Sequence, residues 1–206
     1  MRSVWVGACL VVVVAACGGG EMSQTEYVER LNAIVDQAAR QYGEVVASPQ
    51  GAVLVAESAQ LSDFTPQDLQ WALDRVREIE TGVGEATGAI DPPEPLVELH
   101  EFFFDFDGAF ISSQDALAIR AGTAASWEEL SASPEMAAYR AALAADKQAC
   151  TASQAELNVG VDGGGFAIDA WLTADLKEVV EAVLGCSGYP EHPEDVYRYP
   201  PPTSTS

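Results

Sequence analysis

Apolar residues recur every three or four positions along most of this chain, which is the spacing of one buried face of an α-helix. The first such stripe consists of Tyr27, Leu31, Ile34, Val35, Ala38, Tyr42, Val45 and Val46. Ser23 and Glu26 form an S-x-x-E capping pattern just before it, and the turn-forming sequence SPQG follows it at residues 48–51. The pattern predicts a helix from about residue 23 to residue 48.

A second helix is predicted to begin at Thr65, because a capping threonine, a proline at the first helical position and the carboxylate of Asp68 all favour a helix start. Its apolar stripe is Leu69, Ala72, Leu73, Val76, Ile79 and Val83. Glycines at positions 82, 84 and 88 and the sequence DPP at 91–93 weaken its end. Between the two helices, residues 52–62 are apolar-rich, and we interpret them as one additional turn of helix.

Three longer helices and a short one complete the expected set. One opens near Pro95 and carries Leu96, Leu99, Phe103, Phe106, Phe110 and Leu117 at close to heptad spacing. A short helix is capped by Ser126 with Glu129. The next starts at Ser133 with Met136, Tyr139, Leu143 and Cys150 facing inward. The last runs from about Thr173 with Leu176, Val179, Val180 and Val183, and it ends at Gly185.

No alternating strand pattern of convincing length occurs in the chain. Residues 160–165 are rich in glycine and are predicted to form a loop, across which residues 158–161 and 166–168 could pair briefly as strands. Long helices joined by short proline or glycine loops pack antiparallel. The expected fold is therefore mainly all-α, an up-and-down helical bundle of about four principal helices with one disulfide.

The first residues have the layout of a secretion signal. One positive charge, Arg2, precedes an apolar run at 4–16 that is too short to span a bilayer, and Cys17 with three glycines follows it. The sequence VAAC at 14–17 resembles the lipobox of bacterial lipoproteins. That resemblance implies that Cys17 receives a diacylglycerol and that residues 1–16 are removed. A conventional signal peptide cut after Ala16 and a buried apolar helix are the alternatives.

Four segments follow from this organisation. Residues 1–16 form the lipoprotein signal peptide, 17–22 the lipidated cysteine and a flexible tether, 23–187 a helical bundle domain, and 188–206 a proline-rich tail expected to be disordered. The expected location is the extracytoplasmic face of a membrane, reached through the lipid anchor. Beyond the signal, no second apolar run is long enough to span a bilayer.

The chain is strongly acidic, with 32 Asp and Glu against 10 Lys and Arg and a net charge of -22. Such a surface repels phosphate backbones, so we expect no nucleic-acid partner. The acidity serves solubility, or else it attracts cations or basic partners. Of the four cysteines, Cys9 leaves with the signal and Cys17 is lipidated, so Cys150 and Cys186 are predicted to form a disulfide in an exported protein. Two buried free thiols or a metal pair are the alternatives.

The best candidate for a metal site is formed by Glu98, His100, Glu101 and Asp105, of which Glu101 and Asp105 share a helical face. The alternative is a solvated helix side with His100 at the edge of the core. Of the neighbouring phenylalanines, Phe102 or Phe104 must point away from the core stripe, where it lines a pocket or contacts the short helix near Trp127.

Sequence motifs for catalysis are missing from the chain. Neither a G-x-S-x-G elbow nor an H-E-x-x-H zinc motif occurs, and we expect no cofactor. The leading hypothesis is a non-enzymatic binding or interaction module for a protein, an envelope component or a small apolar ligand. A cation-binding lipoprotein and a carboxylate-dependent enzyme are the alternatives.

Overall fold

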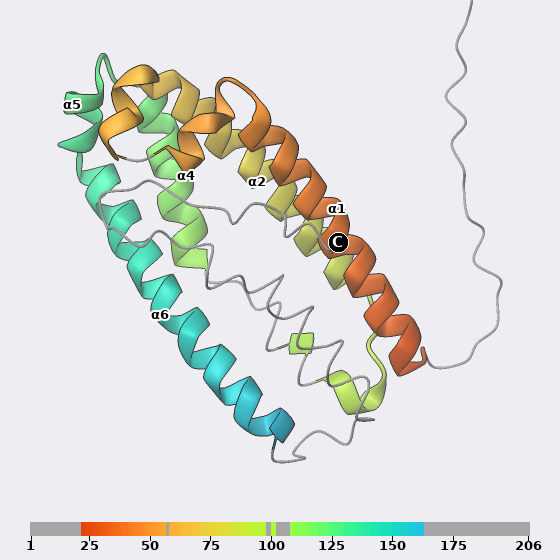
Figure 1. Cartoon of the computed structure of the whole chain (residues 1–206). Helices are drawn as coiled ribbons and strands as arrows, with labels where there is room; N and C mark the ends of the chain where they lie inside the picture. The colour runs from red at the N-terminus through yellow and green to blue at the C-terminus, as the bar shows by residue number, and fades with distance from the viewer. Residues whose placement is uncertain (1–21, 57, 98–99, 102–107, 163–206) are drawn as a thin grey trace, which may run out of the picture.

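The computed structural model describes residues 22–56, 58–97, 100–101 and 108–162, and all regular secondary structure within these ranges is helical. The elements are α1 (Gln24–Ala47), η1 (Gly51–Val55), η2 (Ser58–Asp63), α2 (Pro66–Gly88), η3 (Glu94–Leu96), α4 (Gly108–Thr123), α5 (Trp127–Ser131) and α6 (Pro134–Asp162). The long helices α1, α2 and α6 run along similar directions, and α5 lies at the same end as the α1–α2 connection (Figure 1). The prediction of a mainly helical fold is confirmed for these residues.

Helix α1 begins where the capping pattern predicts. The Ser23 hydroxyl accepts a hydrogen bond from the backbone N–H of Glu26 at 3.1 Å, which satisfies one of the amide groups left open at a helix start. The carboxylate of Glu26 lies 2.7 Å from Arg30 one turn later. At the other end, Ser48 caps the helix by donating its hydroxyl and its backbone N–H to the Val45 carbonyl, and the same hydroxyl accepts a hydrogen bond from the N–H of Gly51. A Cβ at Gly51 would lie 1.9 Å from the backbone oxygen of Val45, so this turn requires glycine.

Helix α2 has a complete capping box. The Thr65 hydroxyl accepts from the N–H of Asp68 at 3.2 Å, and the Asp68 carboxylate accepts from the Thr65 N–H at 2.8 Å. The predicted stripe faces the core, since all its members from Leu69 to Ile79 are buried and Val83 packs partly against them. The helix runs through the glycines at 82 and 84, so these residues do not end it before Gly88.

The long helices pack in chain order, α1 on α2, α2 on α4 and α4 on α6. Helices α2 and α4 are antiparallel. The Gln67 amide at the start of α2 donates to the carbonyls of Ala121 and Ala124 at the end of α4, at 3.3 and 3.0 Å. Further along, Arg77 lies 3.3 Å from the Asp115 carboxylate. These contacts join the two helices over several turns.

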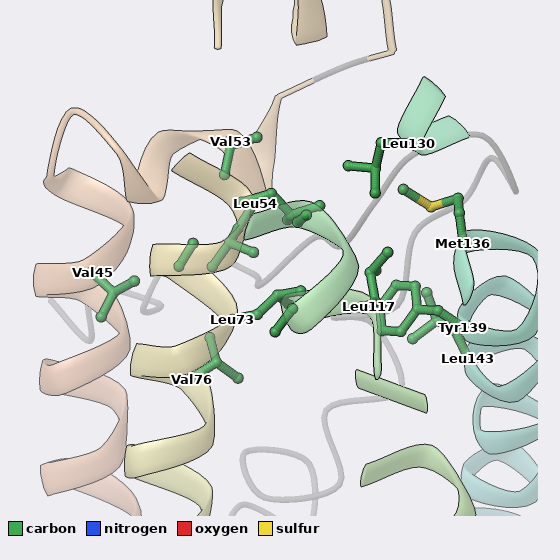
Figure 2. Close-up of a cluster of buried hydrophobic side chains, with 14 of the residues drawn as sticks. Val45, Val53, Leu54, Leu73, Val76, Leu117, Leu130, Met136, Tyr139 and Leu143 are labelled. Carbon is green, nitrogen blue, oxygen red and sulfur yellow. The ribbon is translucent and has the colours of Figure 1, made fainter. Parts of the chain in front are cut away.

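One apolar cluster joins α1, η1, α2, α4, α5 and α6 (Figure 2). Its buried members are Ala38, Val45, Val53, Leu54, Leu69, Ala72, Leu73, Val76, Ile79, Leu117, Ala118, Ala121, Ala124, Leu130, Met136, Tyr139 and Leu143. The 3₁₀ helix η1 brings Val53 and Leu54 into this cluster, so the apolar segment after α1 is part of the core. Burial of this continuous apolar surface is the main force that holds the helices together.

Two expectations about the end of α6 are wrong. Residues 158–161 are helical rather than a strand, and α6 continues to Asp162 through the first part of the predicted glycine loop. A glycine inside a helix costs only about 1 kcal/mol relative to alanine, and the good helix formers before Gly160 offset this. Residues 163–168, the last predicted helix from Thr173 and the proline-rich tail lie outside the described residues, as do Phe102, Phe104 and most of the phenylalanine stripe.

Candidate functional site

His100, the central residue of the predicted cation site, is bound to other parts of the protein. Its Nδ1 lies 3.0 Å from the Tyr27 hydroxyl on α1, and the two rings meet edge to face at 5.7 Å. Burial lowers the pKa of His100, while Glu101 and a backbone hydrogen bond to Thr87 oppose that shift. A neutral imidazole has one donor and one acceptor nitrogen. With one nitrogen on the Thr87 carbonyl and the other on Tyr27, the ring has no nitrogen left for a metal ion.

The other candidate ligands do not complete such a site within the described residues. Glu101 is exposed, whereas Glu98 and Asp105 lie outside the described ranges. Across the part of the chain that the structure describes, no group of three or more His, Cys, Asp or Glu side chains is placed to hold a metal ion. The described contacts of His100 instead tie the start of α1 to the segment after α2.

Only one of the three cysteines with a predicted role lies within the described residues. Cys150 belongs to α6, but its predicted partner Cys186 and the lipidation residue Cys17 both lie outside the described ranges. The disulfide and the lipid anchor therefore stay predictions.

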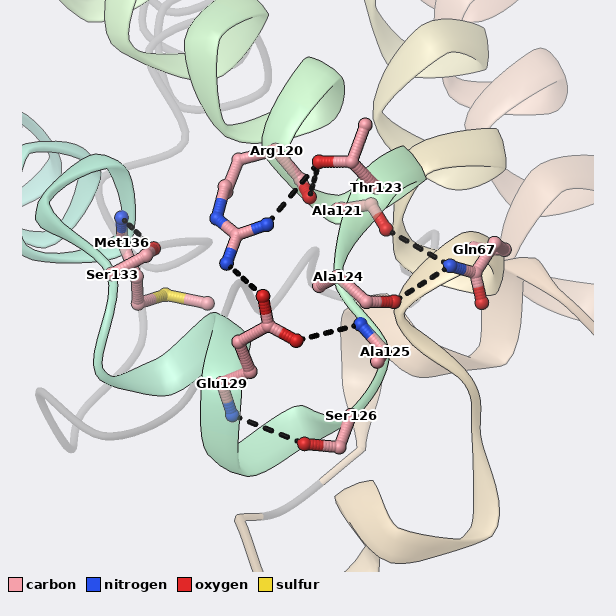
Figure 3. A network of polar contacts seen from close by, with 10 residues as sticks. All are labelled: Gln67, Arg120, Ala121, Thr123, Ala124, Ala125, Ser126, Glu129, Ser133 and Met136. Atoms are coloured by element: carbon pink, nitrogen blue, oxygen red, sulfur yellow. Dashed lines mark hydrogen bonds and ion pairs between the residues drawn. The ribbon is translucent and has the colours of Figure 1, made fainter.

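The corner between α4, α5 and α6 carries a network of polar contacts (Figure 3). Glu129 receives hydrogen bonds from the Arg120 guanidinium at 2.6 Å and from the N–H of Ala125 at 2.9 Å. These two bonds hold the pKa of Glu129 below its usual value. Ser126 caps α5 by accepting from the N–H of Glu129, as its sequence predicts. Every carboxylate oxygen in this network has a partner, so the corner is a structural joint rather than a reactive site.

A shallow groove of about 330 Å³ lies between α1 and α2. Val45 and Ile79 contribute its apolar floor, and Trp71 is only partly buried beside them. The polar lining consists of Gln41, Glu44, Arg75 and Glu78. The Arg75 guanidinium lies 5.7 Å from the centre of the Trp71 ring and is paired with Glu78. The ring face of Trp71 therefore already accepts a cation from the protein itself.

A second chemical feature is a partly buried acid on the apolar side of α2. The Oε2 atom of Glu80 on α2 is buried and has no hydrogen-bond partner among the residues that the structure describes. The pKa of Glu80 is raised to about 7, mainly by burial; Arg77 opposes this shift, and Asp115 on α4 and Asp146 on α6 add to it. Arg77 also pairs with Asp115, at 3.3 Å. At neutral pH this carboxyl is therefore protonated in a large share of molecules.

Tyr139 on α6 belongs to the apolar cluster to which α2 also contributes. It is buried against the core, with its ring 5.9 Å from that of Phe110 on α4. Burial raises the pKa of Tyr139, and the charges of Glu80 and Asp146 raise it further. The buried Oε1 of Gln114 on α4 and the buried Oε2 of Glu135 on α6 also have no hydrogen-bond partner among the described residues. Glu80 is therefore one of several side chains in the described ranges with a buried polar atom that has no partner there.

Sequence reasoning missed Glu80, although the chain contains a signal for it. Position 80 falls four residues after Val76 and three before Val83, on the apolar side of α2. A charged residue within such a stripe is rare unless it is paired or has a shifted pKa. Trp71 was missed for a different reason, since nothing in its local sequence shows that α1 lies beside it.

No protein-family model matches the sequence, and the searches of curated proteins and of solved structures found no similar protein. Among the described helices, none is long and apolar enough to cross a membrane.

Proposed function

We propose that this protein is a non-enzymatic binding module, anchored by lipid on Cys17 at the extracytoplasmic face of a membrane. The observation that carries the anchor is the order of features at the start of the chain, namely Arg2, a short apolar run, VAAC and three glycines. The two acyl chains of a diacylglycerol hold a protein stably at a bilayer, where one chain does not. The glycines then connect the anchor to α1, which starts only seven residues after Cys17.

The proposed body is an up-and-down bundle in which the segment after α6 adds a further helix. A Cys150–Cys186 disulfide would join that helix to α6. In the chain-entropy model, a disulfide that closes a loop of this length contributes about 4 kcal/mol. This link belongs to the same proposal, because it requires the oxidising compartment to which the signal leads.

The proposed contact surface is the groove between α1 and α2, and its proposed occupant is a lysine- or arginine-bearing segment of a partner protein. Glu44 supplies negative charge beside an apolar floor, and a basic side chain that displaces Arg75 would gain the ring face of Trp71 and the carboxylate of Glu78. The net charge of the whole chain attracts basic segments and accelerates their encounter with this surface. Arg75 shows the type of contact that such a segment would make, because it already lies over the Trp71 ring.

Mass analysis of the protein extracted from membranes tests the anchor. We expect a chain that begins at Cys17, carries lipid and gains two hydrogens on reduction. A Cys17→Ser variant is the matched control and should leave the membrane fraction. A protein that retains residues 1–16, or that stays membrane-bound after this substitution, would refute the anchor.

Titration calorimetry with a lysine-rich peptide tests the groove, with a glutamate-rich peptide of equal length as the control ligand. We expect binding of the basic peptide alone, and a loss of about tenfold in affinity for Trp71→Leu, because the ring supplies the specific part of the contact. Ile119 on α4 is 71% exposed and does not line the groove, so Ile119→Ser provides the control variant. Equal affinities of Trp71→Leu and wild type would show only general attraction to an acidic surface.

A further inference from the structure

One arginine of the protein itself occupies the groove between α1 and α2. Trp71, Arg75 and Glu78 follow one another at spacings of four and three residues, so they share the side of α2 that lines the groove. The Arg75 guanidinium lies 5.7 Å from the centre of the Trp71 ring, and its Nη1 lies 2.5 Å from Oε2 of Glu78. A single guanidinium group therefore contacts an aromatic ring and a carboxylate at the same time.

This combination of contacts suits a guanidinium better than an ammonium. A guanidinium is planar and weakly hydrated, so it stacks on an aromatic ring while its N–H groups donate to carboxylates. The ammonium of lysine is a compact and strongly hydrated charge. A guanidinium also has N–H groups for a second carboxylate, and Glu44 on the α1 side of the groove has no ion-pair partner among the described residues. The chemistry of the groove therefore favours arginine.

The contacts of Arg75 are weak enough for another side chain to replace them. The side chains of Arg75 and Glu78 are 49% and 64% exposed, and exposed ion pairs within one helix contribute little to stability. Arg75 stays accessible to water when it leaves the ring, because its side chain is already half exposed. An incoming arginine gains the ring, the carboxylate and, for its methylene groups, the apolar floor of Val45 and Ile79.

We propose that the groove is an arginine-binding site, which Arg75 occupies in the free protein and from which an arginine of the partner displaces it. This inference rests on the proposed function, because it names the side chain that the partner inserts. Arg75 is then an internal competitor, which lowers the affinity of the groove and disfavours lysine. The net charge of the chain attracts arginine and lysine alike, so a difference between the two reports on the groove.

Titration calorimetry with two basic peptides of equal length and charge, one with arginine and one with lysine, tests the site. We expect the whole wild-type protein to bind the arginine peptide about fivefold more tightly, and Trp71→Leu to lose this preference. Equal affinities for the two peptides, or a preference that persists in Trp71→Leu, would overturn the inference and leave basic-segment binding standing. If neither peptide binds better than a glutamate-rich peptide, the proposed contact surface fails as well.

Arg75→Gln tests the internal competition. Removal of the resident guanidinium should raise the affinity for the arginine peptide about fivefold more than the loss of one positive charge elsewhere does. Arg30→Gln is the matched control, because the Arg30 side chain is also 49% exposed, pairs with Glu26 on its own helix and does not line the groove. Equal affinities of the two variants, or weaker binding by Arg75→Gln, would overturn the inference.

Discussion

Two glutamates in this protein have opposite surroundings. Glu129, at the exposed corner of α4 and α5, accepts hydrogen bonds from Arg120 and from the backbone of Ala125 (Figure 3). Glu80, on the apolar side of α2, has a buried oxygen without a partner among the described residues. The fold lowers the pKa of the first carboxyl and raises that of the second.

The difference shows how position decides the role of a carboxylate. At the corner, partners favour the charged form and the group helps to fix a turn, but solvent screens the contribution of such a pair to stability. In the interior, burial favours the neutral form, so folding and protonation become linked. The free energy of unfolding therefore depends on pH through Glu80 in the neutral range, whereas Glu129 affects it only in acid.

The largest expected effect tests whether the corner is held by apolar burial or by its polar network. Leu130 on α5 is fully buried in the shared cluster. Truncation to alanine removes this contact and leaves a cavity, so we expect Leu130→Ala to lower the free energy of unfolding by about 3 kcal/mol. Urea denaturation measures this change. A loss no larger than that of Glu129→Gln would show that the polar network dominates.

The next effect concerns the interior acid and has a definite sign. Because folding raises the pKa of Glu80 from 4.5 to about 7, its stabilising contribution is complete below the unfolded pKa and disappears as the pH rises through about 7. We therefore expect Glu80→Gln to increase the free energy of unfolding at about pH 8 by about 2 kcal/mol, since it removes a buried charge. Denaturation at several pH values should show this gain shrinking towards acid. A destabilised variant at about pH 8 would contradict it.

A smaller effect extends the comparison to a third carboxylate. Asp68 accepts from both the N–H and the hydroxyl of Thr65 in the capping box of α2. Thr65→Ala removes the hydroxyl that caps the helix, and we expect a loss of about 1 kcal/mol in thermal or chemical denaturation. Thr65→Ser keeps the hydroxyl and should restore most of the stability. Equal losses in both variants would assign the effect to the methyl group instead.

The smallest effect is expected for Glu129→Gln. The pKa of Glu129 is lowered by its hydrogen bonds to Arg120 and Ala125, so its contribution is present above the unfolded pKa and disappears as the pH falls through the lowered folded value. The variant should show a small decrease in melting temperature at neutral pH, and the decrease should vanish in acid. This direction is opposite to that of Glu80→Gln, so parallel pH profiles for the two variants would refute the comparison.

The sequence by itself determined where several helices begin and which of their faces are buried. The starts of α1, α2 and α5 were predictable because their caps are local, each joining a side chain to an amide three residues away. The buried faces of α2 and of the start of α6 followed from helical periodicity. The predictions failed at the end of α6, where the strand at 158–161 and the start of the glycine loop are both helical, because one glycine was given more weight than the good helix formers before it.

Only the tertiary structure decided which side chains from different helices come into contact and how their pKa values shift. The Tyr27–His100 bond joins residues 73 positions apart, and the groove at Trp71 needs α1 beside α2. The raised pKa of Glu80 depends first on burial in the fold and then on charges from α2, α4 and α6. No local pattern contains such contacts, because electrostatic interaction and burial depend on distance in space, whereas caps and periodicity depend on distance along the chain.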